Sequence, residues 1–330
     1  MILLAASALL AGVGCRQSAR EVVVYTSVDQ VFSEPVFREF ERETGIKVRA
    51  VFDTEETKST GVLNRLLAER ASPQADVFWS GDSVRPFVLI RQDLVAPYVS
   101  PEAAKTPALF KDPGGLWTGG AARVRVLLVN RNLVPAADRP RSLRDFIAPR
   151  WRGQTAIANP VFGTTTMQIA ALFTAWGDDA AQSFLSGLKA NGVRVASSNG
   201  EVKRLVSTGE VAFGLVDTDD ASEALKDGAP VDVVYPDQDG AGTLVVPTSS
   251  VLMKGSPHPE NGKRLIDHLL SARTERALGL SAAHLPLRAD VDPAPGVRRV
   301  SEIRAMAVDY GRMGETVERI QPILRQWAGL

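Results

Sequence analysis

The sequence predicts an α/β fold of two lobes, each built on a mixed, mainly parallel sheet flanked by helices. Short β-rich runs alternate with amphipathic segments from residue 21 onward, a pattern typical of parallel sheets covered by helices. The chain has 330 residues, which is long for one hydrophobic core and suits two lobes. Apolar runs at 123–130 and 243–253 are expected to cross between the lobes and return. A ligand cleft would then form at the hinge, where strands end.

The N-terminal segment predicts export. Residues 1–14 read MILLAASALLAGVG, are small and apolar, and precede Cys15 and a polar stretch. This resembles the lipobox of bacterial lipoproteins, and fourteen residues are too few to span a bilayer as a helix. We expect residues 1–20 to be signal and linker, and the protein to lie in the periplasm or on the outer face of the cell membrane, lipid-anchored at Cys15. The alternative is an ordinary secretory signal with a chance cysteine.

The first lobe is predicted to contain residues 21–120 and 238–290. Val36, Phe37 and Phe40 recur at helical spacing, and a glycine follows as a stop signal. Proline and glycine dominate the end of this part, which predicts connecting loops at 97–120. Strands are expected at 21–27, 46–53, 75–80 and 243–253, and helices at 35–43, 60–70, 259–270 and 274–280.

The second lobe is predicted to contain residues 121–237 and 291–330. It follows the same alternation of β-rich runs and helical periodicity. Strands are expected at 123–130, 154–159, 193–196, 211–217 and 231–235. Helices are expected at 165–176, 178–190, 201–208 and 221–226, and at 300–310 and 316–327 near the C-terminus.

Composition excludes several classes of function. The chain has 38 basic and 38 acidic residues, which argues against nucleic acid as a partner. No cysteine follows Cys15, so a disulfide framework, a thiolate metal site and a cysteine nucleophile are excluded for the rest of the chain. The three histidines, His258, His268 and His284, have no zinc-site spacing and are expected to lie away from the ligand site. A secreted hydrolase or transferase, the alternative of another class, finds no catalytic motif here.

Four segments resemble the type II periplasmic solute-binding proteins of ABC importers, on the branch that includes ferric-ion-binding proteins. They read VVVYTSVDQVFSEPVFREFERETGIKV, ASPQADVFWSGDS, GEVAFGLVD and VVYPDQDGAGTLVVPTSSVLMKGSPHPENGKRLIDHLLS. The resemblance covers nearly all of the chain after the signal. It implies a non-enzyme, expected to be a monomer, that closes two lobes around a small solute and delivers it to a membrane permease with its ATPase. A sensory binding protein is the alternative use of the same fold.

For the ligand, the resemblance implies ferric iron with a synergistic anion, or a ferric chelate, and no other cofactor. Ferric-binding members carry adjacent tyrosines just after the strand equivalent to 211–217. This chain has Asp217-Thr218-Asp219-Asp220 at that place. Asp219, Asp220 and Glu55 are therefore the candidate metal ligands, Glu55 by its match to a glutamate ligand of some members. A phosphorylated organic solute, such as a sugar phosphate or a phosphonate, is the alternative.

The residues themselves support two kinds of contact in the second lobe. Asp217, Asp219 and Asp220 place carboxylates at a strand end, and hard cations take oxygen ligands; the alternative is helix capping. Backbone N–H groups and hydroxyls at a helix start bind anions, and the alternative is again a simple cap. The candidate anion-binding residues are Gly163, Thr164, Thr165 and Thr166, with Ser198 and Asn199 as a second polar cradle.

Candidates from the first lobe stand at the ends of its three first strands. They are Tyr25, Thr26 and Ser27 after the first strand, Glu55 and Lys58 after the second, and Gly81 and Asp82 after the third. Carboxyl ends of parallel strands meet at one edge of a sheet, so these residues are expected to face the cleft. Lys58 would favour an anionic ligand.

Overall fold

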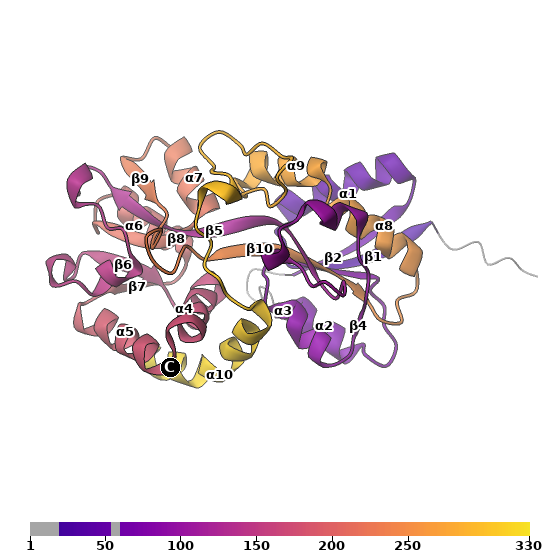
Figure 1. The fold of residues 1–330 in the computed structure, drawn as a ribbon, viewed down its shortest axis with the longest axis horizontal. Helices are drawn as coiled ribbons and strands as arrows, with labels where there is room; N and C mark the ends of the chain where they lie inside the picture. The colour runs from indigo at the N-terminus through magenta and orange to yellow at the C-terminus, as the bar shows by residue number, and fades with distance from the viewer. Residues whose placement is uncertain (1–19, 54–59) are drawn as a thin grey trace, which may run out of the picture.

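The computed structural model describes residues 20–53 and 60–330. Cys15, Glu55 and Lys58 lie outside the described residues. Within them, the protein is a two-lobed α/β structure whose ten strands form one sheet in the order β2-β1-β3-β10-β5-β8-β6-β7, with β4 on β10 and β9 on β5 (Figure 1). No helix in the described part of the chain is both long and apolar enough to cross a membrane.

Lobe 1, as the name is used here, surrounds strands β1 to β4 and part of β10. The strand β1 (Glu21–Thr26) pairs in parallel with β2 (Lys47–Phe52) and β3 (Val77–Ser80), as the alternation of strands and helices predicts. The remaining elements are β4 (Val95–Ala96), α1 (Gln30–Thr44), α2 (Gly61–Ala68), α3 (Arg85–Arg91), α8 (Pro259–Leu269) and α9 (Ala272–Ala282).

Lobe 2 surrounds the strands from β6 to β9 and part of β5. The strand β6 (Thr155–Ala158) pairs in parallel with β7 (Arg194–Ala196) and β8 (Phe213–Asp217). The remaining elements are β9 (Val231–Val234), α4 (Gly163–Trp176), α5 (Asp178–Ala190), α6 (Asn199–Ser207), α7 (Thr218–Lys226) and α10 (Tyr310–Ala328).

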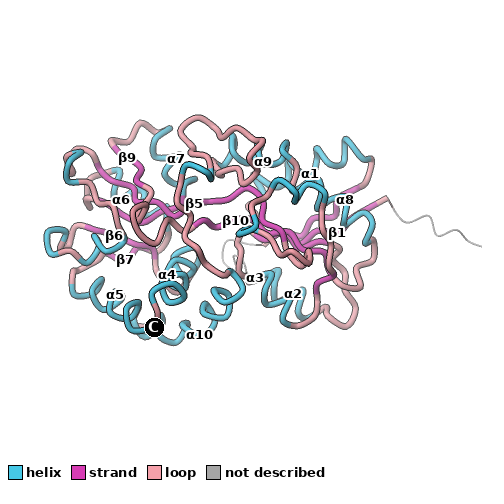
Figure 2. The backbone as a smooth tube through the Cα atoms, in the orientation of Figure 1, coloured by secondary structure: helices cyan, strands magenta, loops and turns pink. Residues whose placement is uncertain are grey.

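Two long strands join the lobes, β5 (Thr118–Asn130) and β10 (Val245–Met253) (Figure 2). The first part of β5 is antiparallel to β10, with Val124 opposite Val245. From Arg125 onward β5 is antiparallel to β8 instead. The change of partner strand therefore falls between residues 124 and 125 of β5.

The helix α10 packs on both lobes (Figure 1). It lies against α4 and α5 in lobe 2, where Arg319 pairs with Asp178 at 2.6 Å. It also lies against α3 in lobe 1, where Glu318 pairs with Arg91 at 2.6 Å. The Tyr310 hydroxyl donates to the carbonyl of Val245 on β10 at 2.8 Å, which fixes the start of the helix at the junction between the lobes.

Sequence periodicity was least reliable before α10 and before β5. A helix at 300–310 is wrong: a short 3₁₀ turn is followed by extended backbone, because Thr243 donates to Arg304 and accepts from Met306. The loop predicted at 97–120 ends early, since β5 begins at Thr118. The sequence analysis also missed α3, a seven-residue helix that begins next to a proline.

Candidate functional site

A buried ion pair anchors the candidate site at the end of β8. Asp217 lies opposite Arg125 in the register of β8 and β5, and its Oδ1 is 2.7 Å from Arg125 Nη1. The side chains are 1% and 0% exposed, respectively. Burial raises the pKa of Asp217, but the charges of Arg125 and Arg123 outweigh burial and hold this pKa below its usual value. Asp217 is therefore ionised.

Arg125 also binds the starts of two helices. Its Nη1 donates to the Thr164 hydroxyl at 2.9 Å and to Asn199 Oδ1 at 3.4 Å, and its Nη2 donates to the Thr165 hydroxyl at 3.2 Å. Thr164 in turn donates to Asp217 Oδ2 at 2.8 Å. The planar guanidinium thus ties β5 to the first turns of α4 and α6, a task that its fixed fork of donors suits.

Two further carboxylates stand beside Asp217. Oxygens of Asp217, Asp219 and Asp220 lie within 4.8 Å of one another, the carboxylate cluster expected from the sequence. Burial raises the pKa of Asp219 to about 6; Arg123 opposes that rise, and Asp217 adds to it. Burial, Asp219 and Asp217 raise the pKa of Asp220 to about 7. A cation among these oxygens would offset both the burial of the carboxylates and their mutual repulsion, so the cluster favours positive charge.

The capping alternative also holds for part of this cluster. Asp217 is the N-cap residue of α7, and its backbone N–H donates to Asp220 Oδ2 at 3.3 Å. Asp219 accepts from the N–H of Asp220 at 3.1 Å. These bonds orient the carboxylates without neutralising their charge. Capping and cation binding are therefore compatible roles for the same residues.

The threonines in the first turn of α4 already form hydrogen bonds through their hydroxyls. Thr164 and Thr165 accept from Arg125, and Thr166 donates to the carbonyl of Pro160 at 2.8 Å. Gly163 adopts a φ of +63° at the first position of the helix. An anion here would meet the N–H groups of the first turn, which have no acceptor within a helix, rather than the hydroxyls.

Most of the candidate residues in lobe 1 form hydrogen bonds to other residues of lobe 1. Thr26 donates to the carbonyl of Trp79 at 2.8 Å, and Ser27 Oγ accepts from the N–H of Gly81 at 2.9 Å. Asp82 accepts from the N–H of Val84 at 2.9 Å at the start of α3. Of this group, Gly81 also contacts the joining strand β5: its carbonyl accepts from Arg123 Nη2 at 2.8 Å.

Tyr25 and Ser198 are bound within their own lobes. The Tyr25 hydroxyl donates to Glu69 at 2.8 Å, and Arg65 lies over the ring. Burial and Glu69 raise the pKa of Tyr25 to about 12, so the phenol keeps its proton near neutral pH in the ligand-free protein. Ser198 caps α6 by accepting from the N–H of Glu201 at 3.1 Å. Asn199, by contrast, reaches the cluster, since its Nδ2 lies 3.3 Å from Asp217 Oδ2.

The other three tyrosines are also engaged elsewhere. The Tyr98 hydroxyl donates to Asp267, and the Tyr310 hydroxyl donates to the carbonyl of Val245. Tyr235 lies under the guanidinium of Arg298. All four tyrosines of the chain are among the described residues, and none has a hydrogen bond to the carboxylate cluster. Any metal bound there would meet carboxylate oxygen rather than phenolate.

The expectation that the histidines lie away from the site is wrong for His284. It follows α9 and sits next to Leu285, which pairs with Ala122 of β5. Burial and the charge of Arg123 lower the pKa of His284 to about 3, against the opposing charges of Asp217 and Asp29. His284 is therefore a neutral imidazole at the lobe junction, because β5 brings a late segment of the chain against it.

The sequence analysis missed Arg123 and Arg125. Arg123 Nη1 lies 3.4 Å from Asp217 Oδ2, so both arginines point to the same carboxylate. The signal was present in the strand at 123–130, where two arginines stand two residues apart among apolar residues. Such residues share one face of a strand, and a buried arginine needs a carboxylate partner.

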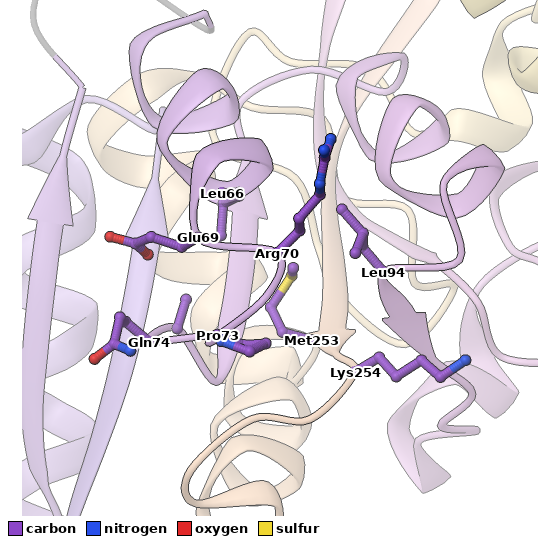
Figure 3. Close-up of a pocket in the computed structure, with 9 residues that line it drawn as sticks. Leu66, Glu69, Arg70, Pro73, Gln74, Leu94, Met253 and Lys254 are labelled. Atoms are coloured by element: carbon purple, nitrogen blue, oxygen red, sulfur yellow. The ribbon is translucent and has the colours of Figure 1, made fainter.

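A small pocket in lobe 1 is a poor alternative site. It lies between the end of α2, β4 and the end of β10, with Met253 between Leu66 and Leu94 (Figure 3). Its volume is about 10 Å³, which is room for about one water molecule. The polar cluster around Arg125 and Asp217 is the candidate functional site because charged side chains of β5, β8 and α7 converge there.

A comparison with protein families identifies the class. Residues 72–310 match the family model described as bacterial extracellular solute-binding protein, and the chain belongs to this family. The type II fold and the solute-binding function expected from the resemblance are confirmed. The family is an extracellular one, and its members bind a small solute for a membrane permease of the ABC type.

Individual relatives point to more than one solute. Iron uptake protein A1 of Synechocystis sp. is 25% identical, over 93% of this chain and 87% of its own. A Salmonella typhimurium protein named for binding 2-aminoethylphosphonate in the periplasm is 27% identical, over 84% and 82%. The structure of iron-bound HitA from Pseudomonas aeruginosa matches with a TM-score of 0.81 and 24% identity, covering 94% of this chain and 99% of its own.

Proposed function

We propose that this chain is the solute-binding component of an ABC importer for ferric iron, carried with an anion or as a ferric chelate. The observation that carries the proposal is the convergence of three carboxylates at the end of β8, with oxygens within 4.8 Å of one another. Ferric iron is a hard cation, and buried carboxylates of raised pKa gain from a nearby positive charge. The iron-binding relatives support the same solute.

The residues divide between the two parts of such a solute. Asp219 and Asp220 would ligate the metal, because Asp217 is already neutralised by Arg125 at 2.7 Å. The anion would bind Arg123, whose guanidinium is partly exposed, and the N–H groups at the start of α4. Glu55 remains a proposed metal ligand from lobe 1, and Lys58 a proposed anion contact.

A zwitterionic phosphonate is the second candidate solute. The cluster holds both signs of charge within one site, since Arg123 lies beside Asp217 and Asp219. A phosphonate group would take the place of the anion, and an ammonium group would take the place of the metal. The relative named for 2-aminoethylphosphonate supports this alternative.

The setting of the protein is proposed with its function. We infer a lipid anchor at Cys15, a monomeric state, and a permease with its ATPase as partners. The lobe boundaries proposed are 21–120 with 238–290, and 121–237 with 291–330. The role is binding and delivery without catalysis, which the sequence supports by its lack of a catalytic motif.

A ligand screen by thermal unfolding tests the proposed solute. The probes are ferric citrate, ferric iron with carbonate, ferric iron with phosphate, calcium, 2-aminoethylphosphonate and glucose 6-phosphate. A solute that binds only the folded state adds about 2.7 kcal/mol at a hundred times its Kd. Stabilisation by the ferric probes alone is the expected result. If 2-aminoethylphosphonate stabilises the protein and no ferric probe does, the proposed solute is wrong and a phosphonate takes its place.

A further inference from the structure

The two arginines of β5 stand on opposite sides of the point where the strand changes its partner from β10 to β8. Arg123 is opposite Val246 of β10, whereas Arg125 is opposite Asp217 of β8. Both side chains lie on the same face of the strand, because they are two residues apart. They therefore reach the same carboxylate from different parts of the hinge.

Arg125 acts within lobe 2. Its partners are Asp217, Thr164, Thr165 and Asn199, which belong to β8, α4 and α6. Its side chain is 0% exposed. A motion of one lobe against the other could leave all of these contacts in place.

Arg123 binds both lobes. Its Nη2 donates to the carbonyl of Gly81 in lobe 1 at 2.8 Å, and its Nη1 lies 3.4 Å from Asp217 in lobe 2. The side chain is 20% exposed, so it is accessible from the junction. Burial lowers the pKa of Arg123, but carboxylates of both lobes together raise it: Asp217, Asp219, Asp29 and Asp82.

The lobe 1 end of this contact is held by hydrogen bonds and close backbone packing. The N–H of Gly81 donates to Ser27 Oγ at 2.9 Å, and the N–H of Ser27 donates to the carbonyl of Trp79. A side chain at Gly81 would place a Cβ 2.9 Å from the carbonyl oxygen of Ser27, so the backbones are in close contact. A force on the Gly81 carbonyl is therefore transmitted to β1 and β3.

We propose that Arg123 is a positioning residue that couples the charge of the bound solute to the placement of lobe 1. A cation on Asp219 competes with Arg123 for the carboxylates of lobe 2, and an anion draws the remaining guanidinium donors towards itself. Either event changes the hydrogen bond from Arg123 to the carbonyl of Gly81. The solute part of this inference rests on the function proposed above, while the contact between lobes does not.

The test compares Arg123→Gln and Arg123→Lys with a matched control. Arg139→Gln removes a partly exposed arginine whose Nη2 lies 2.5 Å from Asp232, within lobe 2. Spin labels on Arg264→Cys in α8 and Lys226→Cys in α7 report the distance between the lobes, in a chain that also carries Cys15→Ser. Both label positions are exposed. Pulsed electron paramagnetic resonance is recorded without ligand and with ferric citrate.

Without ligand, Arg123→Gln is expected to broaden the distance distribution and shift it relative to the parent chain. Arg139→Gln should reproduce the parent, and Arg123→Lys should fall between, since lysine keeps the charge but loses the fork. A distribution for Arg123→Gln equal to the parent's would overturn the proposal, whatever the solute. If Arg123→Gln does not fold by circular dichroism, the comparison rests on Arg123→Lys.

With ferric citrate, the parent should move to one narrow distance, and Arg123→Gln should lose that change and bind about tenfold more weakly. A parent that binds none of the screened probes refutes the proposed solute, and the ligand-free comparison still decides the role of Arg123. A parent and an Arg123→Gln variant that close alike would show that another residue couples the solute to lobe 1.

Discussion

Arg125 and Asp217 lie opposite each other in the register of β5 and β8, and their side chains form an ion pair at 2.7 Å that solvent does not reach. This pair sets the geometry of the site. It fixes the end of β8, and it holds the first turns of α4 and α6 through Thr164, Thr165 and Asn199. The carboxylates that follow in α7 are thereby presented at the junction between the lobes.

Breaking this pair should destabilise the whole protein. Asp217→Asn leaves the Arg125 charge buried without its carboxylate, and such a change costs about 3–5 kcal/mol. Asp232→Asn is the control, because Asp232 pairs with Arg139 where both side chains are partly exposed. A pair of that kind contributes about 0–1 kcal/mol. Urea unfolding measures both, and equal losses would contradict the central role of the Arg125–Asp217 pair.

The ligand-free protein should lose stability as pH rises across the range where Asp219 and Asp220 ionise. Their pKa values are raised to about 6 and about 7 in the fold, so the native state holds protons that the unfolded state has released. Their contribution to the free energy of unfolding therefore falls from about pH 4 to about pH 8. The double variant Asp219→Asn, Asp220→Asn should show a flatter profile by thermal unfolding. A profile as steep as the parent's would contradict these shifts.

Iron binding should release protons from the same carboxylates. A metal ligand must be deprotonated, so the affinity for ferric citrate should fall as pH is lowered through about 7 and 6, by about tenfold per pH unit for each proton displaced. Calorimetric titration in two buffers of different ionisation enthalpy counts the protons. Binding with no proton release at pH 6 would mean that Asp219 and Asp220 do not ligate the metal.

The ferric-loaded protein should lack the visible absorption of an iron–phenolate bond. Tyr25 is the tyrosine among the expected lobe 1 contacts, and its hydroxyl donates to Glu69 instead. Tyr25→Phe should therefore leave the affinity for ferric citrate unchanged, apart from a small loss of stability. A visible band that disappears in Tyr25→Phe would show that the phenol reaches the iron.

Much of the fold could be predicted from local patterns. The alternation of strands and helices in both lobes is confirmed, and α5 has the predicted bounds of 178–190. These elements are set by hydrophobic periodicity and by caps within a few residues. The helix expected at 300–310 failed because Thr243, far away in sequence, binds the backbone there. Hydrophobic periodicity within a segment gives no information on a hydrogen-bond partner that is distant in sequence.

The site could be predicted only in part for the same reason. Asp217, Asp219 and Asp220 were found because they are neighbours in sequence at a strand end. Arg125 is 92 residues from Asp217 along the chain, and only the register of β5 against β8 brings the two together. Nothing in the local sequence indicates that the hydroxyls of Thr164 and Thr165 are hydrogen-bonded, because their partner Arg125 lies on β5, far away in sequence.

The most direct test of the proposed iron site is calorimetric titration of the parent and of Asp219→Asn, Asp220→Asn with ferric citrate. We predict saturable binding of one equivalent by the parent. The double variant should bind about a hundredfold more weakly or not at all, as expected for two lost ligands at about 1.4 kcal/mol or more each. Asp232→Asn is the matched control and should bind like the parent. Equal affinity in the parent and the double variant would contradict a carboxylate iron site at the end of β8.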